Sequence, residues 1–239
     1  MTYNPEIYND QRPNVGVTIV PFIYDEQVIK TLVYKRPIDA EQFANTHALP
    51  NCFYDRKKFK TTDEAAKHAL LVKTNISIPY MEQLHTFSGD HIDPNRINTI
   101  NITYFALLRK SDILNISEKN FVSEWMDVDK LLKKDNFAFN HHEVLSLAWN
   151  RICSKAEYTP IATQLLDEKF TIVEFKALTE LLMNTKLNNS RFRDRVEKSE
   201  LLIPCSGEFE NRKTRPAQLY TVNPHIKDFF YPRSMTKAT

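Results

Sequence analysis

Residues 158–222 contain three helix patterns followed by two short strand patterns, and this order restricts the fold more than any other part of the chain. Pro160 marks the start of a short helix over 161–166. The segment Thr171-Ile-Val-Glu174 is a capping box, so a second helix begins there. Asn188 or Asn189 can cap a third helix, and two strands follow, over 201–203 and 218–222. We therefore predict a winged helix-turn-helix, with residues 204–216 as the polar tip of the wing.

Apolar residues recur at helical spacing in these predicted helices. Phe192 and Val196 lie four residues apart in the third helix and should point inward together. The second helix should bury one face, made of Phe175, Leu178, Leu181 and Leu182. These residues would form the core of the small domain.

The first part of the chain is rich in strands. An apolar, β-branched run over 15–24 predicts a buried strand, and shorter runs predict strands over 28–34, 80–87, 99–108 and 125–126. Helices are predicted from Thr61 or Thr62 to about Lys73, over 128–132 and over 141–152. The order predicts an α/β sandwich that ends near residue 154, so we divide the chain into domains 1–154 and 155–239.

Composition limits the classes of function. The net charge is only +2, so any basic surface must be local, and with 3 glycines the chain has no glycine-rich phosphate loop. Cys52, Cys153 and Cys205 are isolated, which suits a reducing compartment. The polar N-terminus is unlike a signal peptide, and no apolar run reaches the roughly 18 residues of a membrane span. We expect a soluble cytoplasmic protein with no membrane partner.

The helix predicted over 62–73 has no carboxylates where a metal would need them. Ala69, Val72 and Lys73 lie at i, i+3 and i+4, so they share one helical face. Mg²⁺ requires oxygen ligands, which these side chains lack. Asp63 and Glu64 stand in the first helical turn, where helix capping explains them. We predict no metal, no cofactor and no catalytic residue.

Histidines do not supply a metal site either. His141 and His142 are adjacent, so they would point apart on a helix, and no third ligand accompanies them. His68 and His85 are interpreted as packing or surface residues.

Residues 15–152 resemble a Nudix domain, whose signature is G-x5-E-x7-R-E-U-x-E-E-x-G-U with U apolar. Aligned on Leu70 and Ile76, the Arg-Glu pair of the signature falls at His68 and Ala69, and its two later glutamates fall at Val72 and Lys73. The resemblance therefore implies a Nudix-like domain that has lost its catalytic residues.

Residues 157–220 resemble the C-terminal winged helix of Nudix-related transcriptional regulators of the NrtR type. The matching features are Tyr158-Thr-Pro-Ile161, Leu165-Leu166 before Phe170-Thr171, and Arg215-Pro-Ala-x-Leu-Tyr220. The resemblance implies an α/β Nudix-like sandwich domain followed by a winged helix-turn-helix domain. It also implies a repressor that senses ADP-ribose or a related nucleotide or sugar metabolite and controls NAD-related or sugar-utilisation genes. Such regulators are homodimers that bind double-stranded DNA at a palindromic operator.

Basic residues gather on the third helix and the wing of the predicted winged helix. Arginine suits bidentate contact with guanine or phosphate, and a wing suits contact with the DNA backbone or minor groove. Our DNA-binding candidates are Lys186, Asn189, Arg191, Arg193, Arg195, Arg212, Lys213 and Arg215. The alternative is a solvated helix face with ion pairs such as Arg193–Glu197.

The ligand-binding candidates of the first domain are Arg36, Asn51, Phe53, Lys73, Phe87 and Arg96. The Lys73 ammonium would take over part of the role of the missing cation and hold a phosphate. The competing interpretation places Arg36 on the surface and Phe53 and Phe87 in the core.

Two other functions stay open at this point. The chain would be a nucleotide-sugar (ADP-ribose) pyrophosphohydrolase if Glu82 and the pair Asp90 and Asp93 supplied carboxylates for Mg²⁺. Alternatively, the Nudix domain would serve only to dimerise a DNA-binding regulator.

Overall fold

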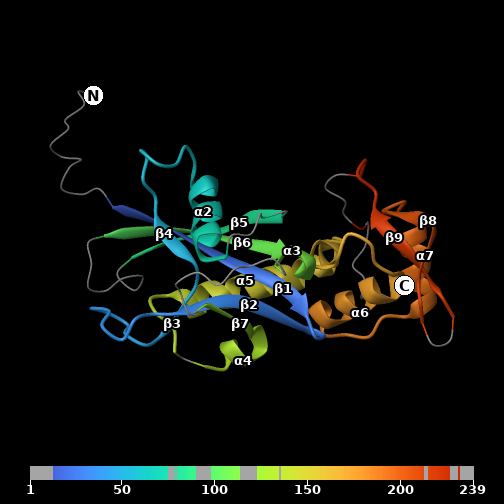
Figure 1. The fold of residues 1–239 in the computed structure, drawn as a ribbon, viewed down its shortest axis with the longest axis horizontal. Coiled ribbons are helices and arrows are strands. Elements are labelled where there is room, and N and C mark those ends of the chain that lie inside the picture. The colour runs from blue at the N-terminus through green and yellow to red at the C-terminus, as the bar shows by residue number, and fades with distance from the viewer. Residues whose placement is uncertain are drawn as a thin grey trace. The chain divides into compact units, whose positions relative to one another are not determined.

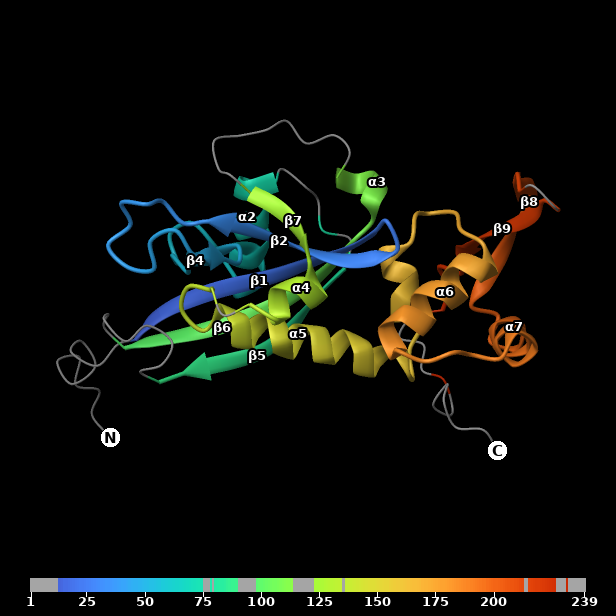
Figure 2. The same ribbon diagram turned by 90° about the horizontal axis from the view of Figure 1, so that it is seen from below.

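The computed structural model describes residues 13–74, 78, 80–89, 98–113, 123–134, 136–212, 215–226 and 231, without the side chains of residues 72–74. The chain forms two compact units (Figures 1 and 2). Unit 1 comprises residues 1–108 and 112–148, and unit 2 comprises residues 109–111 and 149–239. The division falls within helix α5 (His141–Ala156). The assignment of separate functions to 1–154 and 155–239 stays a prediction.

Strand β1 (Asn14–Asp25) is the central strand of unit 1, and residues 17–23 of it are buried. It forms an antiparallel hairpin with β2 (Val28–Lys35) through Glu26 and Gln27, which both have positive φ, as the tight type I′ turn requires. On its other edge β1 pairs in parallel with β6 (Thr99–Leu108) over ten residues. The β-branched runs therefore form the predicted buried strands.

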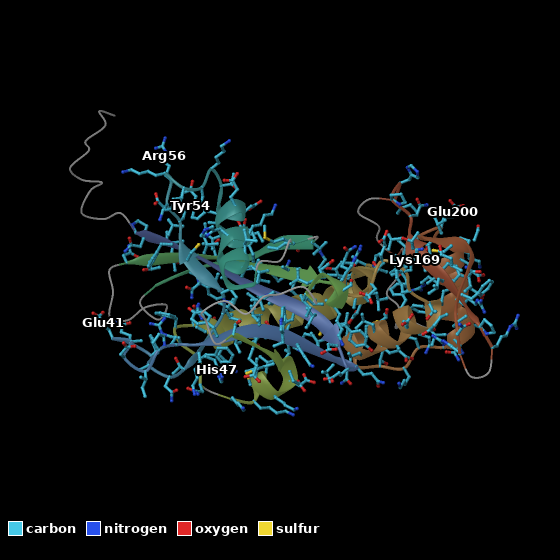
Figure 3. All side chains as sticks on the ribbon, viewed as in Figure 1. Glu41, His47, Tyr54, Arg56, Lys169 and Glu200 are labelled. Atoms are coloured by element: carbon cyan, nitrogen blue, oxygen red, sulfur yellow. The ribbon has the colours of Figure 1, made fainter. Side chains whose placement is uncertain are left out.

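The sheet of unit 1 has the strand order β3-β2-β1-β6-β5. Strand β5 (Tyr80–Ser88) lies at one edge, and β3 (His47–Ala48) lies at the other; Figure 3 labels His47. Strand β4 (Asn51–Phe53) pairs with residues 16–18 of β1, and β7 (Ser123–Asp127) pairs with β2. The sequence did not predict β3 and β4, because strands of two and three residues show no periodicity.

Helices cover both faces of this sheet (Figures 1 and 2). Helix α2 (Thr62–Thr74) packs Ala66, Ala69 and Leu70 against Val17 and Ile19 of β1, which confirms its predicted core face. The first half of α5 buries Val144, Leu145 and Ala148, also as predicted. Short helices α3 (Lys110–Ile113) and α4 (Val128–Leu132) complete the helices described before residue 157; the sequence predicted α4 but not α3.

Unit 2 contains the 3₁₀ helix η1 (Ile161–Leu165) and helices α6 (Ile172–Met183) and α7 (Asn189–Lys198). Both halves of the predicted capping box are present at the start of α6. Asn188 caps α7, since its side-chain oxygen accepts the Arg191 backbone N–H at 3.1 Å. The predicted core residues of α6 and α7 are buried except Leu181, which is 37% exposed because Leu178 and Leu182 occupy the inward face.

The wing consists of β8 (Leu202–Glu210) and β9 (Ala217–Val222). Strand β8 extends to Glu210, so the prediction of a tip over 204–216 was wrong. The register shifts between Pro204 and Phe209, around Gly207 with its positive φ. The Gln218 side-chain amide donates to the Cys205 carbonyl at 2.7 Å and so holds this irregular stretch against β9.

Among the described residues, no helix is long and apolar enough to cross a membrane.

Candidate functional site

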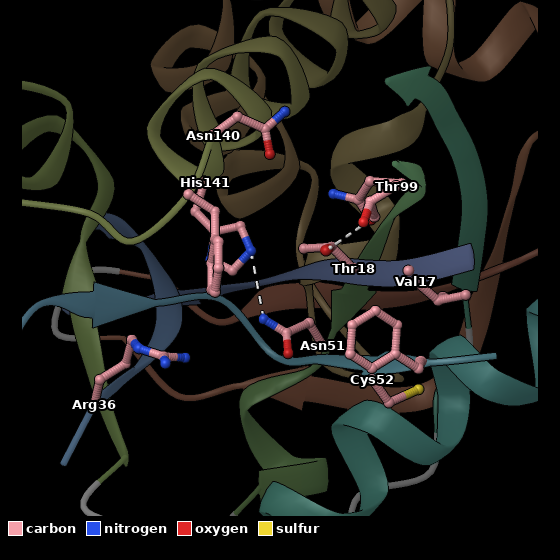
Figure 4. Close-up of a pocket in the computed structure, with 12 residues that line it drawn as sticks. Val17, Thr18, Arg36, Asn51, Cys52, Thr99, Asn140 and His141 are labelled. Atoms are coloured by element: carbon pink, nitrogen blue, oxygen red, sulfur yellow. Dashed lines mark hydrogen bonds between the residues drawn. The ribbon is translucent and has the colours of Figure 1, made fainter. Parts of the chain in front are cut away.

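A pocket of about 130 Å³ opens in unit 1 beside the first half of β1 (Figure 4). Strands β1, β4 and β6, the loop after β2 and the start of α5 contribute its lining. These residues are Gly16, Val17, Thr18, Arg36, Asn51, Cys52, Phe53, Thr99, Asn101, Phe139, Asn140 and His141. The lining contains no carboxylate, and Arg36 is its only residue with a full charge at neutral pH. The pocket therefore suits a ligand that binds through neutral hydrogen bonds and one cation.

His141 is a central polar residue of this pocket. Its ring is fully buried, and Nδ1 accepts the Leu49 backbone N–H at 3.1 Å. Burial, and to a smaller extent the positive charge of Arg36, lower the pKa of His141 to about 3. The neutral ring accepts through Nδ1, so it carries its proton on Nε2, which makes Nε2 a hydrogen-bond donor within the pocket.

Asn51 faces that donor. The distance between the Asn51 amide nitrogen and His141 Nε2 is 3.4 Å (Figure 4). A half-turn of the amide about its Cβ–Cγ bond places the Asn51 oxygen there as an acceptor for the Nε2 proton. The sequence analysis rejected His141 as a metal ligand but did not find it as a pocket residue. Because 92 residues separate His141 from Leu49, no local spacing indicates this contact.

Arg36 lies in the pocket in a fixed orientation. Its Nε donates to the Gln42 carbonyl at 3.2 Å, and its guanidinium carbon lies 5.0 Å from the centroid of the Phe139 ring. A cation above an aromatic face at this distance is attracted by the ring quadrupole. The guanidinium is thus held in place before any ligand arrives.

The structure places three of the six predicted ligand residues in the lining: Arg36, Asn51 and Phe53. Phe53 is 50% exposed, so it is not a core residue. Phe87 is buried in β5, where its ring meets that of His85 at 4.8 Å, and it does not line the pocket. The Lys73 side chain and Arg96 lie outside what the structure describes. Thr18, Asn101 and Asn140 are lining residues that the sequence analysis missed.

The acids at the start of α2 have structural partners. Glu64 accepts the Lys60 backbone N–H at 2.7 Å, while its own N–H donates to Thr61 Oγ1 at 3.2 Å. Asp63 accepts from the Tyr104 hydroxyl at 2.7 Å. In the described part of the chain, no three His, Cys, Asp or Glu side chains are grouped as metal ligands. These contacts agree with the capping role that the sequence indicated for Asp63 and Glu64.

Helix α7 presents a basic surface in unit 2. Asn189, Arg191 and Arg193 are exposed, and Arg193 also pairs with Glu197 at 3.1 Å, the ion pair that the alternative interpretation expected. Arg195 is half-buried, with its guanidinium carbon 5.7 Å from the centroid of the Tyr231 ring. The structure therefore separates Arg195, which packs within unit 2, from the freely exposed Arg191.

The other basic candidates differ in the same way. The Lys186 side chain is 92% exposed and lies 3.6 Å from Glu180, and Arg215 is also exposed. Arg212 donates to Glu210 at 2.5 Å and to Thr171 Oγ1 at 3.0 Å, which ties the wing to the capping box of α6. Lys213 lies outside the described residues.

Comparison with known proteins places both units. Residues 162–222 match the family model of the NrtR DNA-binding winged helix domain. The whole chain is similar to the crystal structure of Shewanella oneidensis NrtR complexed with a 27mer DNA. The identity is 28%, the TM-score is 0.81, and the match covers 92% of this chain and 98% of that one. The chain belongs to the NrtR family of Nudix-related regulators.

Two further NrtR-family proteins extend this result. The chain is 29% identical over 223 residues to the ADPR responsive transcriptional repressor NtrR of Acinetobacter baylyi, covering 93% of this chain and 87% of that protein. It also resembles the NUDIX domain of Shewanella oneidensis NrtR complexed with ADP ribose, at 25% identity and a TM-score of 0.51, over 63% of this chain and 94% of that one. The NrtR-type fold, a Nudix-like sandwich domain followed by a winged helix, is thereby confirmed.

Proposed function

We propose that this chain is a DNA-binding transcriptional repressor whose Nudix-like domain binds ADP-ribose or a related nucleotide or sugar metabolite. The observation that carries the proposal is a pocket without carboxylates in the same chain as a winged helix with exposed arginines. The pocket has the means to hold a ligand but lacks the acids that would hold Mg²⁺ beside a pyrophosphate. The relatives' responses to ADP-ribose and binding of DNA support the same function here.

The Nudix-like domain binds its effector without hydrolysing it. Glu64 and Asp63 already accept hydrogen bonds that fix the start of α2 and the Tyr104 hydroxyl. Without a metal, nothing in the described pocket polarises a pyrophosphate or activates water. Purified protein incubated with ADP-ribose and Mg²⁺ or Mn²⁺ should release no AMP above the rate of a protein-free control. Release at an enzyme-like rate would establish hydrolysis and contradict this part of the proposal.

The DNA-binding form is a homodimer on a palindromic operator in the cytoplasm. Two copies of α7 would enter successive major grooves about one helical turn apart, with Asn189, Arg191 and Arg193 facing the DNA. The exposed wing residue Arg215 and Lys186 would contact the backbone. Target genes in NAD metabolism or sugar utilisation follow from the same effector chemistry.

The test begins with selection of binding sites from random-sequence DNA duplexes by the full-length protein. Enrichment of an inverted repeat is expected, and the enriched duplex then serves for fluorescence anisotropy titrations with and without ADP-ribose. A repressor of this kind should bind the duplex more weakly when ADP-ribose is present. Failure to enrich any sequence would argue against an operator-binding function.

The pocket favours sensing over a Nudix domain used only for dimerisation. A dimerisation domain does not need Arg36 and His141 placed in an open pocket. Calorimetry with ADP-ribose, NAD, NADP and pentoses distinguishes these possibilities. Heat of binding for one of these compounds supports a sensor, whereas no binding across the panel supports the dimerisation function.

A further inference from the structure

Asn140 has an environment that the fold alone does not explain. It directly precedes α5, is 7% exposed and lines the pocket. Of the described residues, it alone has two buried side-chain polar atoms, Nδ2 and Oδ1, without a hydrogen-bond partner. Its backbone carbonyl, rather than its side chain, bonds to the helix, accepting from the Val144 N–H at 3.0 Å. An unmade hydrogen bond of a buried group costs about 1–3 kcal/mol, so an external partner is expected.

The amide specifies the chemistry of that partner. It presents a donor and an acceptor side by side in one plane, so two hydrogen bonds require a planar group with an adjacent acceptor and donor. The exocyclic amine of adenine, together with a neighbouring ring nitrogen, has this arrangement, and asparagine pairs with adenine in this way in nucleic-acid recognition.

The size of the pocket agrees with a single ring system. Its volume is about 130 Å³. In an engineered protein cavity, roughly 150 Å³ is enough for a benzene ring, so a base fits here while the rest of a nucleotide extends outward. Phe53 at the opening and Phe139 beneath Arg36 supply aromatic surfaces, on which bases stack readily.

The surroundings of Asn140 are neutral. His141 and Asn51 lie with it in the lining, and Thr18 Oγ1 donates to Asn101 Oδ1 at 3.0 Å in the same pocket (Figure 4). A neutral base therefore meets no buried charge that would have to be compensated, which favours a base over a phosphate near Asn140.

We propose that the pocket holds the adenine ring of the effector and that the Asn140 amide recognises its amino edge. Nδ2 donates to a ring nitrogen of adenine, and Oδ1 accepts from the exocyclic amine. This assignment rests on the proposed function, because it takes an adenine nucleotide as the effector.

The test is a calorimetric cycle on the full-length protein with two ligands, ADP-ribose and 1,N6-etheno-ADP-ribose. The etheno bridge ties the exocyclic nitrogen into a ring and removes its N–H donors. Wild type should bind ADP-ribose about 10- to 100-fold more tightly than the etheno compound, as expected when buried hydrogen bonds are lost. The Asn140→Leu variant should lose about the same factor for ADP-ribose and little for the etheno compound.

Thermal unfolding without ligand distinguishes recognition from a structural role. Replacing an unpartnered buried amide by an apolar group of similar size should leave the unfolding temperature unchanged or raise it. Asn136→Leu, at an exposed position four residues earlier, is the matched control and should bind both ligands like wild type. If Asn140→Leu unfolds early, Asn140→Ala removes the amide without adding a branched side chain and takes its place in the cycle.

Each failure has a distinct signature. Equal losses for both ligands, or none, in the Asn140 variant overturn the recognition of the amino edge while leaving ADP-ribose as the effector. Equal affinity of wild type for the two ligands does the same without any variant. No binding of ADP-ribose by wild type removes the proposed effector and the adenine assignment together.

Discussion

Neutral residues dominate the pocket at the scale of single side chains. His141 is kept neutral by burial and by the nearby charge of Arg36, and Asn140 keeps an unpartnered amide. Both features lower stability relative to an apolar core, since each buries polar groups that water would otherwise satisfy. Residues placed in this way prepare a pocket for a ligand, and the same burial makes the stability of unit 1 sensitive to acid.

His141 predicts a fall in stability below neutral pH. In the unfolded chain its imidazole takes up a proton below about pH 6.5, whereas the pKa of about 3 keeps the folded ring neutral. Protonation therefore favours the unfolded chain, and the free energy of unfolding falls as the pH drops from 6.5 towards 3. Between pH 7 and pH 5 this group should contribute a loss of about 2 kcal/mol. Denaturant titrations at the two pH values measure the loss.

The His141→Asn variant isolates this contribution. Its Oδ1 can accept the Leu49 N–H in place of Nδ1, and it does not titrate, so the difference between pH 7 and pH 5 should be smaller than in wild type. Other acid-sensitive groups act equally in both proteins. An identical pH dependence in the two proteins would mean that His141 is protonated or exposed.

At the scale of elements, the sequence predicted what is long and periodic. The run over 15–24 and the capped helix from Thr62 follow from local rules, and both formed as expected. Strand β4 escaped prediction because its three residues are fixed by pairing with a distant part of β1. The pocket shows the same limit: Asn51 was found from its loop, but Asn140 and His141 reach it only through the packing of α5. Arg195 was misplaced because its contact with Tyr231 crosses 36 positions of sequence.

The capping box of α6 should be a strong local determinant of unit 2. Thr171 Oγ1 accepts the Glu174 N–H at 3.2 Å and also a hydrogen bond from Arg212 at 3.0 Å. Thr171→Ala removes both contacts and should lower the free energy of unfolding by about 1–2 kcal/mol. Ser190→Ala, at an exposed position in α7, should change it little. Equal unfolding temperatures of the two variants would contradict a role for the cap.

Helix α7 makes a different prediction for each of its arginines. Arg191→Ala or Arg193→Ala should weaken binding of the selected duplex by about 1–3 kcal/mol if the residue contacts a base. Loss of a phosphate contact would instead reduce the dependence of affinity on salt. Arg195→Ala should mainly lower the unfolding temperature, because its guanidinium packs on Tyr231.

The measurements are anisotropy titrations at several salt concentrations, paired with thermal unfolding. Lys198→Ala, at the exposed last position of α7, serves as the control. Wild-type affinity in both the Arg191 and Arg193 variants would remove α7 as the recognition helix.

At the scale of the whole molecule, the two units are useful together only if their ligands are coupled. Because α5 runs from the pocket residue His141 into unit 2, one continuous helix belongs to both units. A ligand shifts the DNA-binding equilibrium by no more than its differential affinity for the two states of the protein. Binding energy in the pocket can thus act on DNA only through such a difference.

Coupling between the sites should be reciprocal. If ADP-ribose weakens binding of the selected duplex by a factor within the common range of about 5 to 150, the duplex must weaken binding of ADP-ribose by the same factor. Anisotropy titrations of duplex with saturating ADP-ribose, and calorimetric titrations of ADP-ribose with saturating duplex, give the two factors independently. The Asn140→Leu variant should need more ADP-ribose to reach the same weakening of duplex binding, because its loss lies in the pocket and not in α7. A factor of one in both directions would mean that the pocket does not regulate DNA binding, even if it binds ADP-ribose tightly.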